Sequence, residues 1–149
     1  MKKVDLKYVH QGISVFNMDE SVEWYKKIFD AEVLRDYIHE YVNCRIVLLK
    51  AGEAFFELLE YLGADKEPIP ENRRDSRLDL RIGGTKHVCY SVESMPDFFR
   101  EKVIPYNVEI DNGPRREKDN YMAFIRDNSG ICIELYDIGG AIREPDAFQ

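Results

Sequence analysis

The sequence is poor in cysteine and lacks any long apolar run. Its three cysteines, Cys44, Cys89 and Cys132, are an odd number, and no two of them form a C-x-x-C pair. This argues against a disulfide framework and favours reduced thiols in a cytoplasmic protein. No apolar stretch approaches the roughly 20 residues that a membrane-spanning helix needs. The start, M-K-K-V-D-L-K-Y-V-H, is basic but lacks the apolar core of a signal peptide.

The sequence also lacks an excess of positive charge. Its 28 acidic and 21 basic residues give a net charge of −7, which is a poor match to nucleic acid. No glycine-rich loop of the kind that cradles phosphate is present. The 149 residues, of which 44% are hydrophobic, suffice for one ordinary domain or for two small modules that share a core. We therefore expect a globular protein with a small-molecule partner.

The chain contains an internal repeat that carries histidine and glutamate. The same interval of 47 residues separates His10 from Glu57 and His87 from Glu134, so one half repeats the other at an offset of 77. The surrounding residues follow this register, since V-H-Q-G-I-S-V at 9–15 matches K-H-V-C-Y-S-V at 86–92. A-F-F-E-L-L at 54–59 likewise matches I-C-I-E-L-Y at 131–136. A duplicated module with one imidazole and one carboxylate in each half indicates half of a metal site used twice.

Each half has the pattern of a strand, a helix and then further strands. In the first half, alternation predicts a strand over 8–16, a helix that begins after the N-cap Asn17, and strands near 32–38, 44–51 and 53–61. In the second half, Ser94 is the expected cap of a shorter helix, followed by strands near 106–111, 120–127 and 131–137. We expect module one at about 8–62, a charged connector at 63–84 that crosses between the modules, module two at about 85–137, and a tail at 138–149.

Alternation along these strands places the four repeated residues on one face of the sheets. Each carboxylate has an apolar residue on both sides in the sequence, so the carboxylates point away from the core, as do the histidines. A lone histidine on a strand is usually a hydrogen-bonded structural residue, and a lone glutamate is usually solvated. Their recurrence at one spacing favours ligation of a divalent metal by His10, Glu57, His87 and Glu134. Mixed nitrogen and oxygen ligands suit Zn, Ni, Co, Mn or Fe.

Three motifs resemble the vicinal oxygen chelate superfamily, which includes glyoxalase I, methylmalonyl-CoA epimerase, extradiol dioxygenases and bleomycin-resistance proteins. They are H-Q-G-I-S-V with the helix S-V-E-W-Y-K-K-I-F, then G-G-T-K-H-V-C-Y-S-V, and F-I-R-D-N-S-G-I-C-I-E-L. The resemblance covers about residues 8–137. It implies an α+β fold in which two repeated βαβββ modules form a curved mixed sheet cup around one metal, in a chain that is commonly a homodimer.

The resemblance also implies a reaction. His10 and His87 match the first-strand ligands, and Glu57 and Glu134 match the last-strand ligands. Glutamate at both last-strand positions is most similar to glyoxalase I, which favours a lyase or isomerase that moves a proton beside a metal-bound carbonyl. Glu134 or Glu57 would be the base, with Glu134 preferred. Two alternatives stay open: an Fe(II)-dependent dioxygenase, which needs only three protein ligands, and a metal-free resistance protein, which usually lacks the ligands.

Other residues carry weaker expectations. Five arginines could bind an anionic part of the substrate, although most are expected to be solvated loop charges: Arg35, Arg73, Arg74, Arg115 and Arg116. Cys89 faces the cup by parity and is expected to be a small buried thiol. His39 has no histidine at the repeat offset and is expected at the surface or on a strand. Trp24, Tyr25 and Phe29 are expected in the core, and Tyr121 and Phe124 could line the cup.

Overall fold

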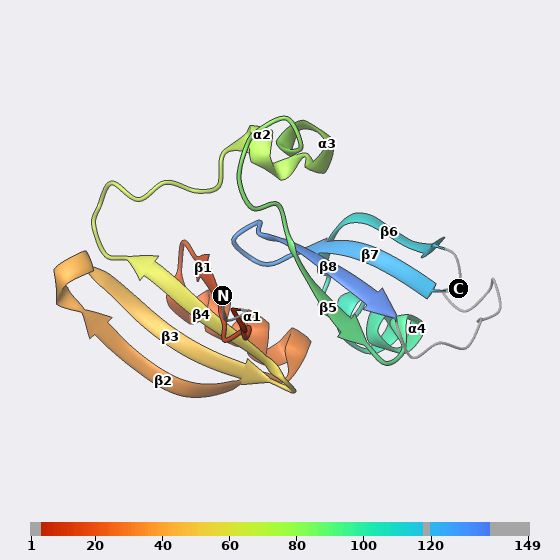
Figure 1. The fold of residues 1–149 in the computed structure, drawn as a ribbon, viewed down its shortest axis with the longest axis horizontal. Helices are drawn as coiled ribbons and strands as arrows, with labels where there is room; N and C mark the ends of the chain where they lie inside the picture. The colour runs from red at the N-terminus through yellow and green to blue at the C-terminus, as the bar shows by residue number, and fades with distance from the viewer. Residues whose placement is uncertain (1–3, 118–119, 138–149) are drawn as a thin grey trace.

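The computed structural model describes residues 4–117 and 120–137, and these form two four-stranded mixed sheets (Figure 1). The strand order is β1-β4-β3-β2 in the first sheet and β5-β8-β7-β6 in the second. The elements of module one are β1 (Gln11–Ser14), α1 (Met18–Phe29), β2 (Glu32–His39), a 3₁₀ turn (Glu40–Val42), β3 (Cys44–Ala51) and β4 (Ala54–Tyr61). The predicted α+β fold with two repeated modules is confirmed. The expected tail at 138–149 lies outside the described residues.

Module two repeats the plan of module one. Its elements are β5 (Val88–Val92), α4 (Met95–Phe98) continued by a π-helical turn (Phe99–Val103), β6 (Glu109–Glu117), β7 (Asn120–Arg126) and β8 (Cys132–Asp137). Between the sheets the connector carries two short helices, α2 (Glu71–Arg74) and α3 (Ser76–Asp79). None of the helices in the described ranges is both long and apolar enough to cross a bilayer.

Strand register reproduces the offset of the sequence repeat. In the parallel pair β1–β4, Gly12 lies opposite Glu57, and in the parallel pair β5–β8, Cys89 lies opposite Glu134. Gly12 and Cys89 are 77 residues apart, as are the two glutamates. Both modules therefore present their glutamate at the same position relative to the first strand.

Helix α1 begins where the sequence predicts. The side chain of Asn17 accepts a hydrogen bond from the backbone N–H of Glu20, and Asp30 ends the helix in the left-handed conformation with φ of 52°. Tyr25 and Ile28 on its apolar side are fully buried. Ser94 caps α4 in the same way by accepting from the N–H of Asp97. Both predicted caps are confirmed.

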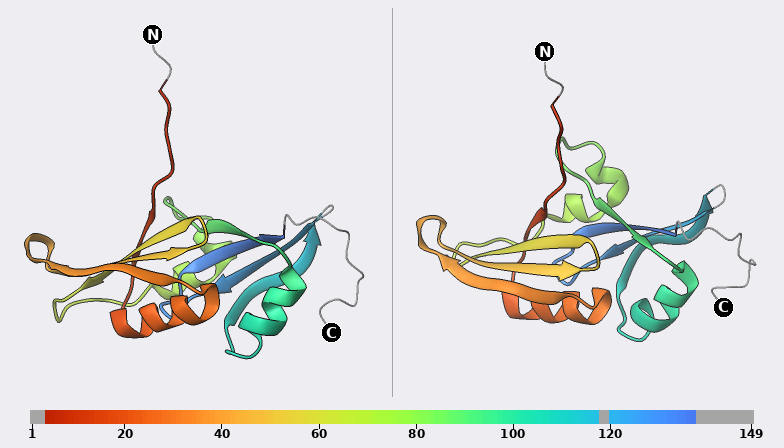
Figure 2. Two further views of the ribbon diagram at one scale, coloured as in Figure 1. Left: turned by 90° about the horizontal axis from the view of Figure 1, so that it is seen from below. Right: turned by 60° about the horizontal axis from the view of Figure 1, so that its bottom comes forward.

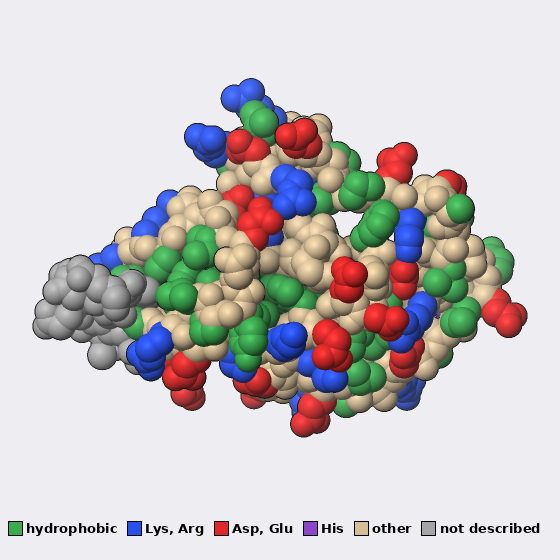
Figure 3. Space-filling model, turned by 180° about the vertical axis from the view of Figure 1, so that it is seen from behind, with side chains coloured by type: hydrophobic (Ala, Val, Ile, Leu, Met, Phe, Trp, Pro, Cys, Tyr) green, Lys and Arg blue, Asp and Glu red, His purple; other side chains and the backbone are tan. Residues whose placement is uncertain are grey.

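The two modules share their apolar packing through the helix side. Phe29 of α1 stacks on Phe56 of module one and on Phe98 of module two, at ring separations of 5.9 and 6.0 Å. Trp24 and Tyr90 also pack against both core clusters. Helices α1 and α4 lie on the same side of the sheets (Figure 2). A view of this side shows acidic and basic side chains intermixed (Figure 3). The opposite faces of the sheets are left for a site.

The first predicted strand is shorter than expected. Alternation favoured residues 8–16, with Val9 packed under the helix, but β1 begins at Gln11 and Val9 is 68% exposed. The partner strand β4 begins at Ala54, opposite Val9, so residues before Val9 have no strand to pair with, and Val9 and His10 themselves stay outside the ladder. Residues 4–10 instead leave the body of the protein as an extended arm on the side opposite the helices (Figure 2).

Candidate functional site

The first candidate half-site lies where the arm joins the first sheet. His10 directly precedes β1, and Glu57 is in the middle of the adjacent strand β4. The parallel register brings their side chains together, with Nε2 of His10 3.3 Å from Oε2 of Glu57. The imidazole is 41% and the carboxylate 27% exposed, so the pair is open to solvent on the face away from the helices.

The second half-site has the same construction in module two. His87 directly precedes β5, Glu134 is on β8, and Nε2 of His87 is 3.0 Å from Oε2 of Glu134. The ring of Phe124 meets the imidazole edge-on with centroids 5.2 Å apart, which confirms that Phe124 lines this face. Glu134 is the more enclosed carboxylate, at 16% exposed.

The two pairs remain separate in a single chain. Among residues 4–117 and 120–137, no three histidine, cysteine, aspartate or glutamate side chains form a group that could hold a metal ion. Each pair supplies one nitrogen and one oxygen donor, which is half of a tetrahedral shell. The structure thus brings His10 to Glu57 and His87 to Glu134, and it does not join the four residues into one cluster.

The donor set of each pair nevertheless fits a divalent metal. Two ligands at about 2.0–2.2 Å from one ion lie about 3.0–3.5 Å from each other. The nitrogen–oxygen separations of 3.3 and 3.0 Å are in this range. His10 with Glu57, and His87 with Glu134, are therefore spaced as neighbouring ligands of one ion would be.

Cys89 differs from its expected environment. The sequence predicts a buried thiol, but the residue is exposed. The reason is that, within residues 4–117 and 120–137, no helix or sheet packs on the face of β5 that carries it. Its partial burial, and then the nearby Glu134 carboxylate, raise the pKa of the thiol to about 11, so it stays protonated at neutral pH. A neutral thiol beside Glu134 is a poor nucleophile.

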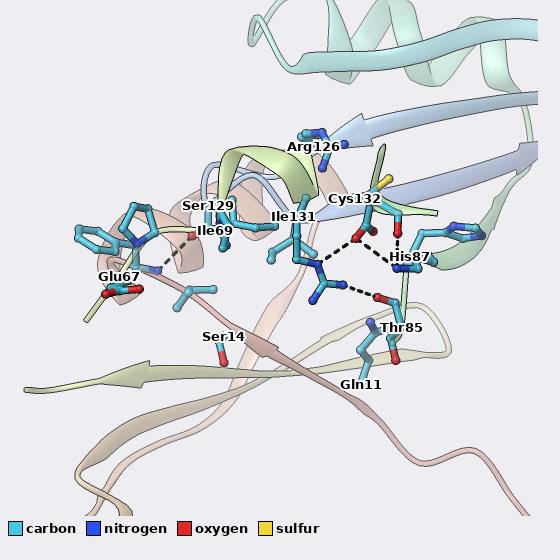
Figure 4. Close-up of a pocket in the computed structure, with 17 residues that line it drawn as sticks. Gln11, Ser14, Glu67, Ile69, Thr85, His87, Arg126, Ser129, Ile131 and Cys132 are labelled. Atoms are coloured by element: carbon cyan, nitrogen blue, oxygen red, sulfur yellow. Dashed lines mark hydrogen bonds and ion pairs between the residues drawn. The ribbon is translucent and has the colours of Figure 1, made fainter. Parts of the chain in front are cut away.

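A pocket of about 430 Å³ adjoins the second half-site (Figure 4). Its walls come from β1 and the two residues after it, from the connector and His87, from the end of β7 and the turn after it, and from the start of β8. His87, Thr85 and Gln11 lie toward one end of the pocket, and Glu67 lies at the other. The volume is in the range of small-molecule sites, which is about 300–1,000 Å³.

Buried charges between the connector and module two were missed by the sequence analysis. Arg126 is 2% exposed, donates to the carboxylate of Asp111 and to the carbonyl of Gly130 at 2.9 Å each, and also bonds the carbonyl of Arg74. Asp79 is buried as well and accepts from Arg73 and Lys86. The sequence held one weak signal of this burial, because alternation along β7 places Arg126 on the same face of the strand as the apolar Phe124.

Three of the five arginines singled out from the sequence have different surroundings. Arg73 lines the pocket beside His87, whereas Arg74 pairs with Glu109 at 2.8 Å outside that pocket. Arg115 donates to the sulfur of Met122. His39 ends β2 and is exposed, as predicted, and Trp24, Tyr25 and Phe29 are in the core, as predicted.

Comparisons with known proteins agree with this architecture. The sequence matches the family model described as Glyoxalase/Bleomycin resistance protein/Dioxygenase superfamily over residues 7–135. A comparison with curated proteins found no match. A glyoxylase/bleomycin resistance protein/dioxygenase domain from Frankia sp. EAN1pec is 21% identical with a TM-score of 0.72, covering 92% of this chain and 100% of that one.

Two further solved structures are similar. The trypanothione-dependent glyoxalase I of Leishmania major is 23% identical with a TM-score of 0.67, covering 89% of this chain and 87% of that one. A glyoxalase family protein from Bacillus cereus is 17% identical with a TM-score of 0.70, covering 91% and 96%. These likenesses establish a common fold. Because the family match spans residues 7–135 of 149, the chain belongs to the glyoxalase/bleomycin resistance protein/dioxygenase superfamily.

Proposed function

We propose that the protein is a metal-dependent lyase or isomerase that transfers a proton at a carbon next to a carbonyl of a small substrate. One observation carries the proposal: two His–Glu pairs lie at equivalent register positions with the spacing of neighbouring metal ligands. His10, Glu57, His87 and Glu134 would hold one divalent ion among Zn, Ni, Co, Mn and Fe. When bound, such an ion polarises a substrate carbonyl and acidifies the adjacent C–H bond.

Glu134 is the proposed base. Its carboxylate would take the proton from the acidified carbon and return it to the neighbouring carbon, so that no redox partner is consumed. Glu134 is more enclosed than Glu57, and the ring of Phe124 beside its partner His87 limits access of water. Glu57 would then act mainly as a ligand. The pairing of Glu57 with His10 disfavours the dioxygenase alternative, which needs only three protein ligands.

A homodimer would complete the metal shell. The His10–Glu57 pair of one copy would face the His87–Glu134 pair of its partner, which gives two equivalent sites per dimer and one ion per chain. The exposed arm supports this assembly, because Val4, Leu6 and Tyr8 alternate with polar residues as in a half-buried strand. Strand β2 is exposed along its whole length and leaves a sheet edge for a partner.

Metal analysis of variants tests the proposal. Replacing His10 or His87 with Ala should sharply reduce the metal content of the purified protein, measured by mass spectrometry, because each substitution removes one of four ligands. His39→Ala is the matched control, since this exposed histidine lies outside both pairs. An unchanged metal content in both His10→Ala and His87→Ala would exclude the four-ligand site.

A further inference from the structure

We infer that Arg73 binds a carboxylate of the substrate in the pocket beside His87. The substrate of the proposed metal site would therefore be a small organic acid, with its carbonyl end at the metal and its carboxylate at the connector. This inference rests on the proposed function, and it adds the class of substrate and a residue that selects it.

Arg73 is the cation of the pocket with a free donor. Arg126 also lines the pocket, but its guanidinium is buried against Asp111 and two backbone carbonyls. Lys86 is engaged by the carbonyls of Asp79 and Ile82 and by the carboxylate of Asp79. Within the described residues, Nη1 of Arg73 has no hydrogen-bond partner, and the side chain is 35% exposed.

The connector holds the guanidinium of Arg73 in a fixed position. Nε donates to the carboxylate of Asp79 at 3.0 Å, and Nη2 donates to the carbonyl of Thr85 at 2.9 Å. Burial alone would raise the pKa of Asp79, but the hydrogen bonds from Lys86 and Arg73 outweigh it and keep that pKa lowered, so the carboxylate is charged. A guanidinium that is already oriented loses little freedom when it binds an anion.

The charge of the pocket is uneven along its length. Arg73 and Lys86 share the single carboxylate of Asp79, which leaves one net positive charge near Thr85 and His87. The other acidic residue of the lining, Glu67, lies at the far end (Figure 4). Across from Thr85, Gln11 of β1 offers an amide that could donate to a second carboxylate oxygen. An acid would thus be drawn to the end of the pocket that adjoins the candidate metal ligand.

Matched 2-oxo acids provide the test. Metal-loaded protein is titrated with 2-oxo diacids of five, six and seven carbons and with the 2-oxo monoacids of the same lengths. Both series carry the same vicinal oxygens, so they differ only in the distal carboxylate. We expect the preferred diacid to bind about 10-fold or more tighter than its monoacid, as a charge-assisted hydrogen bond allows.

Arg73→Gln should abolish this preference and leave the metal content unchanged. Arg77→Gln is the matched control, because Arg77 is on the same connector and pairs with Asp75, but it does not line the pocket. A preference that survives in Arg73→Gln, or is absent from the original protein at every length, would overturn the inference. Loss of metal in the histidine variants is scored separately and concerns only the proposed function.

A second variant covers the case in which Arg73→Gln disturbs the connector. Gln11→Glu places a carboxylate across the pocket without removing any bond of Arg73. It should weaken diacids by about 10-fold more than monoacids, because only diacids bring a second negative charge to that end. Equal weakening of both series, with an unchanged melting temperature, would count against Arg73 as the carboxylate site.

Discussion

Tyr25 of α1 donates its hydroxyl proton to the buried carboxylate of Asp127, 102 residues further along the chain, at 3.0 Å. The bond joins the helix of module one to the turn between β7 and β8 of module two. Asp127 also accepts from the backbone N–H groups of Ser129 and Ile131, so one carboxylate both shapes the turn and anchors the other module. The relative position of the modules depends on this polar contact as well as on the stacked rings around Phe29.

Tyr25→Phe should lower the free energy of unfolding by about 1–3 kcal/mol. The substitution keeps the buried ring but leaves a buried carboxylate oxygen without its donor. Urea unfolding followed by circular dichroism measures the change. Tyr37→Phe on the exposed strand β2 is the control and should change the free energy by no more than about 0.5 kcal/mol. Equal effects of the two substitutions would show that the Tyr25 bond contributes nothing.

Ionisation of Asp127 should reduce stability as the pH rises. Burial raises the pKa of Asp127 above its ordinary value of 3.8, and the hydrogen bonds from Ile131, Tyr25 and Ser129 only partly oppose this. The folded protein therefore holds this proton more tightly than the unfolded chain does. The resulting stabilisation is complete below pH 3.8 and is lost as the pH rises through the raised pKa of the folded state.

The comparison with Asp127→Asn isolates this contribution. The free energy of unfolding is measured for both proteins from acid to neutral pH, and the difference between them cancels the other carboxylates. We expect the advantage of the original protein over Asp127→Asn to shrink with rising pH. A difference that grows with pH would mean that the carboxylate is stabilised in its charged form.

Glu134→Gln should lower the turnover rate by about 10²–10⁴ if proton transfer limits it. The amide keeps an oxygen near His87 but cannot accept the substrate proton. Glu57→Gln is the informative comparison, because it changes the equivalent ligand of the other module and should have the smaller effect on rate at equal metal content. Anaerobic turnover of 2-oxoaldehyde–thiol adducts or 2-methylacyl thioesters provides the assay. Catechol turnover that stops without oxygen would favour a dioxygenase instead.

Leu6→Asp should weaken self-association. Leu6 is 87% exposed on the arm, and covering such a side chain contributes about 1.5–3 kcal/mol, which is about 10- to 100-fold in a dissociation constant. Sedimentation equilibrium gives the monomer–dimer constant. Leu80→Asp, at an exposed leucine of the connector, is the control. Identical association of both variants and the original protein would remove the arm from the interface.

Local patterns in the sequence were sufficient for most of the fold. The caps Asn17 and Ser94 were identified because a side-chain acceptor preceded an apolar helical stripe. The strand at 44–51 was predicted with its observed bounds, Cys44–Ala51, since both of its neighbours are strands of the same sheet. The repeat offset of 77 also predicted that the two sheets are equivalent in their strands and in the register of those strands.

What the sequence could not provide depends on distant contacts. Strand β1 starts later than alternation predicts, and its partner β4 begins only opposite Val9, which alternation around Val9 does not encode. The burial of Arg126 involves a carbonyl of the connector, that of Arg74, which is 52 residues away in the chain. The repeat placed His10 near Glu57 and His87 near Glu134, and neighbouring strands do bring each pair together, whereas a metal site formed by all four residues stays a prediction. Whether the two pairs meet depends on docking between modules or copies.

The repeat is imperfect at one position that matters for how a substrate is oriented. Gly12 opposite Glu57 presents no side chain, whereas Cys89 opposite Glu134 presents a thiol. A site assembled from two identical halves would let a substrate bind in two equivalent orientations, related by the twofold axis between the halves. With sulfur beside one carboxylate and bare backbone beside the other, these two orientations become inequivalent, so a single difference in a duplicated module gives the substrate a preferred direction in the site.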